Sequence, residues 1–232
     1  MKRATLIALV AIGTLVIVGC GQDEAEFPDD TTAGGECGPW YPGGGGGADA
    51  GVDGGAEANY AVEEGAIFPC AVWDSAMLDG EDTFINVGQI YLEAKHGVTD
   101  TKAIVIVIGA ENCPSCSTLI SAMTERIPDF EAAGALMIGM ARRDLQGVPE
   151  DPDFTMDKAY EVLEAEDWPV DQWYSISDEE NYIPVSFDVA PPWLIIVRVS
   201  DMIVMTASNV AVSPNDDGVQ DLLDYLNGPD FQ

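Results

Sequence analysis

Along the chain, continuous apolar runs typical of buried strands alternate with apolar residues at helical spacing, and this order predicts an α/β fold. Residues 103–108 and 135–140 are almost wholly apolar and rich in aliphatic side chains, as expected of strands covered on both faces. Between them, apolar residues recur at helical spacing over 116–130. We expect Pro128 to kink or divide this helix and Gly134 to end it.

Shorter apolar patterns lie before and after residues 103–140. They predict a strand at 84–87, a helix over 89–92 that leads into the next few residues, and a further helix at 155–166. Two apolar runs, 193–199 and 202–207, are separated by a tight turn and predict an antiparallel hairpin. The order is therefore β-α-β, a helical segment, then a hairpin and a helix.

The last helix has the clearest boundaries. Ser213 is expected to cap it, Pro214 to occupy its first position, and Asp216 to complete a capping-box-like pair. Apolar residues over 219–226 form its buried stripe, and Gly228 ends it.

The amino-terminus predicts export. Lys2-Arg3 precede the uncharged, mostly apolar stretch 4–18, and Ile17-Val18-Gly19-Cys20 resembles a bacterial lipobox with Cys20 as the lipidated residue. We therefore predict a lipoprotein signal peptide at 1–19. The alternative is a plain amino-terminal anchor helix, which also exports the rest of the chain.

Charge limits the possible partners. The chain has 41 acidic and 9 basic residues, a formal charge of −32. Nucleic-acid binding is excluded because the chain has too few lysine and arginine side chains to neutralise phosphates. The acidity predicts a well-solvated surface, with a specific basic partner as the alternative.

Composition also divides the exported part of the chain. Residues 20–66 are dominated by Gly, Ala, Asp, Glu and Pro, and such a segment buries too little surface to offset the entropy of ordering it. We expect an acidic, glycine-rich flexible tether there, followed by the folded domain at 67–232.

The candidate chemistry lies at Cys113-Pro114-Ser115-Cys116, between the first apolar run and the helix that follows it. Cys113 is expected at the helix N-cap and Pro114 at its first position. There the free backbone N–H groups and the helix dipole favour thiolate, and the thiol pKa in such motifs falls from ~8.5 to between ~3.5 and ~7. Cys113 would attack a disulfide and Cys116 would resolve the mixed disulfide.

The order of elements, with this motif after the first buried strand and Pro192 just before the hairpin, resembles the thioredoxin fold. More narrowly, residues 113–116 and 189–197 look like those of the membrane-anchored thiol-disulfide oxidoreductases of the TlpA/ResA type, over roughly 67–228. The resemblance implies a thioredoxin-like three-layer sandwich, with a central mixed sheet flanked by helices. It also implies that Pro192 is a cis-proline facing the dithiol.

The resemblance implies a function as well. The protein would be a thiol-disulfide oxidoreductase that needs no cofactor beyond its redox-active disulfide and no metal. Its partners would be protein thiols or disulfides and an unidentified redox partner. Together with the lipid anchor at Cys20, this places it in the bacterial cell envelope, on the periplasmic side or in an outer membrane.

Three positions depart from the family pattern. Asn112 stands where an aromatic residue usually precedes the first cysteine, Ser121 where a proline often kinks the helix, and Val107 where thioredoxins carry a buried carboxylate. The strand thus supplies no proton acceptor, and Glu111 or another carboxylate would have to replace it.

Other interpretations of the cysteines remain open. Cys113 and Cys116 are alternatively a permanent structural disulfide, in a non-catalytic thioredoxin-fold lipoprotein that binds a protein partner, or half of a zinc site with Cys37 and Cys70. We expect Cys37 and Cys70 to form a structural disulfide; the alternative is a relay that exchanges with the active pair. The only histidine, His96, is expected at the surface of a helix end.

An aromatic cluster follows the predicted 155–166 helix. Trp168, Trp173 and Tyr174 lie within seven residues. Core packing is the first interpretation, and lining of a substrate groove near the dithiol is the second.

Overall fold

The computed structural model describes residues 41–42, 62–111, 113–142, 155–177, 183, 191–209 and 216–231, which all belong to one compact unit, 31–232. Its strands are β1 (Val72–Leu78), β2 (Glu81–Asn86), β3 (Ala103–Ala110), β4 (Ala135–Arg142), β5 (Tyr174–Ile176), β6 (Trp193–Arg198) and β7 (Ile203–Asn209). Its helices are α1 (Val87–Lys95), α2 (Pro114–Thr124), α3 (Ile127–Ala132), α4 (Met156–Ala165) and α5 (Asp216–Leu226), with a short 3-10 turn at Pro229–Phe231.

The described strands form one mixed sheet in the order β2-β1-β5-β4-β3-β6-β7. β4 runs parallel to both β3 and β5, and the remaining neighbours are antiparallel. β3 therefore lies inside the sheet, between β4 and β6, as the wholly apolar run predicted.

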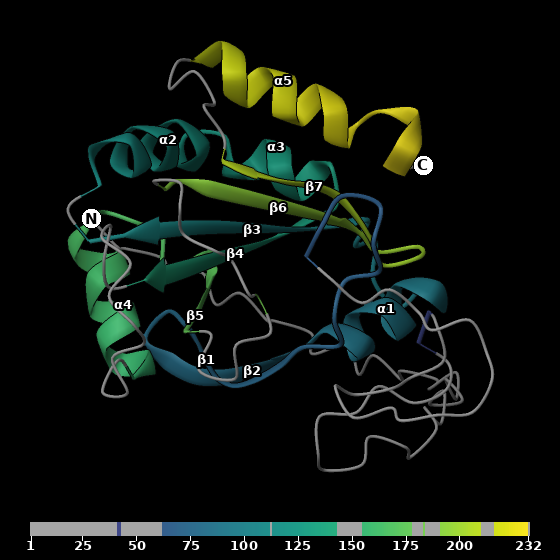
Figure 1. The fold of residues 1–232 in the computed structure, drawn as a ribbon, viewed down its shortest axis with the longest axis horizontal. Coiled ribbons are helices and arrows are strands. Elements are labelled where there is room, and N and C mark those ends of the chain that lie inside the picture. The colour runs from purple at the N-terminus through teal and green to yellow at the C-terminus, as the bar shows by residue number, and fades with distance from the viewer. Residues whose placement is uncertain are drawn as a thin grey trace, which may run out of the picture. The chain divides into compact units, whose positions relative to one another are not determined.

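Helices cover both faces of this sheet, which confirms the three-layer arrangement. Apolar residues of α2, α3, α4 and α5 pack with Val105 and Val107 of β3 in one buried cluster. Residues of α1 pack with Ile104 and Ile106 in a second cluster on the opposite face. Figure 1 shows α2, α3 and α5 along one side of the sheet.

Burial of β3 stabilises the centre of the sheet. All its residues are buried, and each fully buried aliphatic side chain contributes about 1.5–3 kcal/mol relative to exposure. A strand with two apolar faces has one stable environment, the centre of the sheet.

The helix after β3 is divided as predicted. α2 ends at Thr124, and α3 begins with Pro128 in its first turn. Gly134 follows with φ of 75°, a conformation that glycine adopts without steric cost. A Cβ there would lie 2.6 Å from the carbonyl oxygen of Asp100, so the turn into β4 requires glycine.

An ion pair fixes the hairpin turn between β6 and β7. Arg198 donates from Nε to Asp201 Oδ1 at 2.9 Å and from its terminal nitrogen to Oδ2 at 2.7 Å. The hydrogen bond to Asp201 raises the pKa of the Arg198 guanidinium above its ordinary value. This two-point contact holds the turn that joins β6 to β7.

Two strands were not predicted, and one was displaced. β1 contains Asp74 and Ser75 at a register shift, so it lacks regular alternation, and β5 has only three residues. The strand predicted at 84–87 is β2, which ends at Asn86. The Asn86 side chain accepts from Gln89 N at 3.0 Å and so caps α1, which places Val87 in the helix.

The packed region extends upstream of residue 67, where the sequence predicted the domain to begin. Tyr41 is buried, donates to the Phe68 carbonyl at 2.8 Å, and packs edge-on against Tyr91. Gly65 N donates to Val204 O at 2.8 Å. An aromatic ring and a backbone hydrogen bond thus hold parts of the predicted tether against the domain, a contribution that composition did not indicate.

The remaining amino-terminal predictions, including the signal peptide, lie outside the described residues, as do Ser213 and Pro214. The buried stripe of α5 is confirmed at Val219, Leu223 and Leu226. Among the described residues, no helix is long and apolar enough to span a membrane.

The sheet leaves no room for a side chain at Gly109. A Cβ there would lie 2.5 Å from Trp168 Cζ2. We expect Gly109→Ala to lower the free energy of unfolding by about 1–3 kcal/mol through overpacking, measured by urea denaturation. In a Trp168→Leu background the additional loss should be smaller, because the clashing ring is gone. An unchanged midpoint in the Gly109→Ala protein would contradict the packing described.

Candidate active site

Cys113 is the N-cap residue of α2, as predicted. Its backbone is extended (φ −103°, ψ 95°), Pro114 lies in the first turn, and the turn contains no acidic residue. Cys116 N donates to Cys113 Sγ at 3.2 Å. The sulfur thus receives a backbone N–H at the positive end of the helix, where negative charge is favoured.

Cys113 and Cys116 are joined in a disulfide, with their Cα atoms 5.2 Å apart. Both cysteines are almost fully buried, 2% and 1% exposed. Pro114 and Ser115, between them, are exposed. The bond therefore lies just beneath the exposed tip of the motif.

The segment before β6 lies against this pair. The Pro191–Pro192 peptide bond is cis, as the resemblance implied, and the Pro191 carbonyl oxygen is 3.8 Å from Cys113 Sγ. Ser115 Oγ donates to the same carbonyl at 3.3 Å. The structure thus brings together Cys113, Cys116 and the segment of Pro192, which lie far apart in the sequence.

The carboxylate position of thioredoxins is apolar here. Val107 is fully buried in a cluster of apolar residues. A different carboxylate reaches α2: Ser117 Oγ donates to Glu166 Oε2 at 3.1 Å. Sequence reasoning missed Glu166, because it follows α4, 49 residues further along the chain, and nothing in the local spacing connects it to α2.

The other predicted cysteines are only partly described. Cys70 forms a disulfide, while Cys37 lies outside the described residues, so their pairing stays a prediction. Cys20 and Asn112 also lie outside them. Because a zinc site needs thiolates, the disulfide state of Cys70, Cys113 and Cys116 does not support the zinc interpretation.

The aromatic cluster belongs to the core. Trp168 and Trp173 are buried and pack edge-to-face, 6.2 Å between ring centroids. Trp168 covers Gly109 and Gly139 on neighbouring strands. This supports core packing over a substrate groove. His96 is exposed at the end of α1, as predicted.

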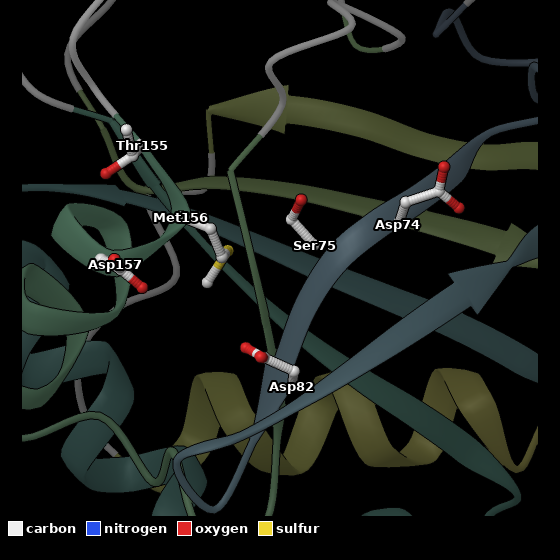
Figure 2. A pocket seen from close by; sticks show the side chains of 6 residues that line it. All are labelled: Asp74, Ser75, Asp82, Thr155, Met156 and Asp157. Atoms are coloured by element: carbon white, nitrogen blue, oxygen red, sulfur yellow. The ribbon is translucent and has the colours of Figure 1, made fainter.

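A hollow of about 350 Å³ lies elsewhere, between β1, β2 and the start of α4. It is lined by Asp74, Ser75, Asp82, Thr155, Met156 and Asp157. Figure 2 shows the three carboxylates spread around the hollow rather than gathered at one point. In the part of the chain that the structure describes, no group of three or more His, Cys, Asp or Glu residues has the geometry of a metal site.

The strand order, the cysteine pair at the start of α2 and the cis-proline before β6 define a thioredoxin-like α/β fold. Within that fold, the chain carries a Cys-x-x-Cys pair in its disulfide form.

Comparison with known proteins gives distant structural likenesses. A thiol:disulfide interchange protein from Bacteroides sp. is 12% identical, with a TM-score of 0.46, over 72% of this chain and 92% of that one. The thioredoxin domain of a thiol-disulfide oxidoreductase from Bacteroides vulgatus is 9% identical, with a TM-score of 0.43, over 69% and 98%.

Thioredoxin peroxidase I from Plasmodium yoelii is 13% identical, with a TM-score of 0.49, over 71% of this chain and 89% of that one. No protein-family model and no curated protein matches the chain. The fold and the site are therefore defined by the chain's own topology and contacts.

The two sulfurs have different environments, and we expect different reactivity. In the reduced protein, Cys113 should alkylate faster than Cys116 at mildly acidic pH, because the helix N-terminus favours its thiolate. Peptide mass mapping after brief iodoacetamide treatment measures this. Equal and slow labelling of both cysteines would contradict the N-cap argument.

Proposed function

We propose that the protein is a thiol-disulfide oxidoreductase of the cell envelope that exchanges disulfides through Cys113 and Cys116. The observation that supports this most directly is the Cys113–Cys116 disulfide at the start of α2, against the cis Pro191–Pro192 segment. The disulfide joins residues three apart at the start of a helix, with their Cα atoms 5.2 Å apart. The position at a helix N-terminus favours the thiolate that exchange requires.

The reaction moves two electrons. In the reduced protein, the Cys113 thiolate attacks a substrate disulfide, forms a mixed disulfide and releases one substrate thiolate. Cys116 then loses its proton and attacks the Cys113 sulfur. The protein disulfide forms and the second substrate thiolate leaves. The two substrate thiolates take up the proton from Cys116 and the one that Cys113 had released to solvent, and become two thiols. The reverse sequence oxidises a substrate dithiol.

The proposed location follows from the sequence. A lipid anchor at Cys20 and the acidic segment after it would hold the domain outside the cytoplasmic membrane, where disulfides persist. The partners would be protein thiols or disulfides and a redox partner that restores the pair. No cofactor beyond the disulfide enters this chemistry.

Burial favours a second candidate. Because both cysteines are at most 2% exposed, a protein substrate has little access to the bond in the oxidised state. This suits a non-catalytic thioredoxin-fold lipoprotein that binds a protein partner and keeps the pair as a structural disulfide.

Trapping of the mixed disulfide tests the proposal. In a Cys116→Ser variant, Cys113 attacks but nothing resolves the product. We expect the purified variant to form a mixed disulfide at Cys113 with glutathione disulfide, detected by intact mass and reversed by dithiothreitol.

The matched control is Cys113→Ser, which retains only the second sulfur of the pair, away from the helix N-cap. It should react far more slowly under the same conditions, with circular dichroism showing that both variants are folded. Equal reactivity of the two variants, or none in either, would favour the structural disulfide.

A further inference from the structure

The hydroxyl of Ser115 lies between two hydrogen-bond acceptors. Its Oγ is 3.4 Å from Cys113 Sγ and 3.3 Å from the carbonyl oxygen of Pro191. The serine is exposed, whereas the Cys113 sulfur that it borders is buried. A hydroxyl has one proton to donate, so it serves one of these two acceptors at a time.

The oxidation state of the cysteines decides which acceptor is stronger. In the disulfide, Cys113 Sγ is a neutral sulfur and a weak acceptor, so the carbonyl of Pro191 receives the proton. After reduction, the Cys113 thiolate carries a full charge, and hydrogen bonds to ionised acceptors are roughly twice as strong as neutral ones. Both atoms are already within reach, so rotation of the hydroxyl is sufficient.

We propose that Ser115 is a positioning residue whose hydroxyl switches from the Pro191 carbonyl to the Cys113 thiolate when the disulfide is reduced. The inference rests on the proposed exchange function and deepens it. The second donor joins the Cys116 N–H that already points at this sulfur, 3.2 Å away. Two donors stabilise the thiolate relative to the thiol.

Reduction supplies the charge that drives the switch. Two equivalents of a small thiol reduce the Cys113–Cys116 bond and become one disulfide, and their two protons pass to the protein sulfurs or to solvent. When Cys113 releases its proton to solvent, the Ser115 hydroxyl turns to the thiolate and the Pro191 carbonyl loses its donor.

Other titratable groups border the motif. Cys116 is bonded to Cys113, Glu166 accepts from Ser117 on α2, and Glu111 lies two residues before Cys113 in the sequence. They are the same in every variant compared below, so a difference between hydroxyl-bearing and hydroxyl-free side chains at position 115 reports on the hydroxyl alone.

The pH dependence of alkylation tests the switch. In the reduced full-length protein, the rate of iodoacetamide labelling at Cys113, followed by peptide mass, gives the pKa of its thiol. We expect Ser115→Ala to raise this pKa by about one unit, a tenfold change in the thiol–thiolate equilibrium. Ser115→Thr keeps the hydroxyl and should leave the pKa within a few tenths of the wild-type value.

Thr118→Ala is the matched control. Thr118 is an exposed hydroxyl on the same helix that donates to Pro114 O at 2.9 Å, and its loss should not move the Cys113 pKa. Ser115→Gly provides a second hydroxyl-free variant if Ser115→Ala folds poorly, and it should show the same rise.

The outcomes separate this inference from the proposed function. Suppose that dithiothreitol reduces the pair in the native protein, and that the Cys113 thiol has the same pKa in wild type, Ser115→Ala and Ser115→Thr. This result would overturn the switch and leave the exchange function standing. An equal rise in Ser115→Ala and Ser115→Thr would also overturn it. A pair that resists reduction in the native state would overturn the exchange function and the switch together.

Discussion

The pairing of β3 with β6 determines everything else at the site. Ile108 pairs with Trp193, so the chain that leaves the end of β3 and the chain that enters β6 meet at the same edge of the sheet. Cys113 begins α2 on one side of this edge, and Pro191 and Pro192 precede β6 on the other. A slip of one residue would send every β3 side chain to the wrong face, and the two buried clusters prevent it.

Two opposing effects act on the sulfurs at this edge. Burial disfavours a thiolate, while a helix N-terminus and nearby N–H donors favour it. Cys113 has the N-cap position and receives the N–H of Cys116, and the hydroxyl of Ser115 lies 3.4 Å from its sulfur. Cys116 lies further into the helix, and both cysteines are almost fully buried. In the proposed exchange reaction, this asymmetry favours Cys113 as the attacking sulfur and Cys116 as the resolving one.

The sequence predicted the parts of the fold that rest on local patterns. The apolar run of β3 and the N-cap at Cys113 each have a direct physical signature, whereas the role of the proline before β6 came from the family resemblance. β1 and β5 escaped prediction because a bulge interrupts one and the other is too short to show alternation. Contacts made by folding, such as Tyr41 with Phe68 and Glu166 with Ser117, have no signature in the local spacing.

The central claim is that the Cys113–Cys116 bond opens and closes in the native protein. The most direct test is its reduction potential, measured by equilibrating the folded protein with defined dithiothreitol or glutathione redox buffers. We expect a reversible two-electron couple within the range of known oxidoreductases, about −270 to −120 mV. A pair that is reduced only under denaturing conditions would contradict the claim and identify a structural disulfide.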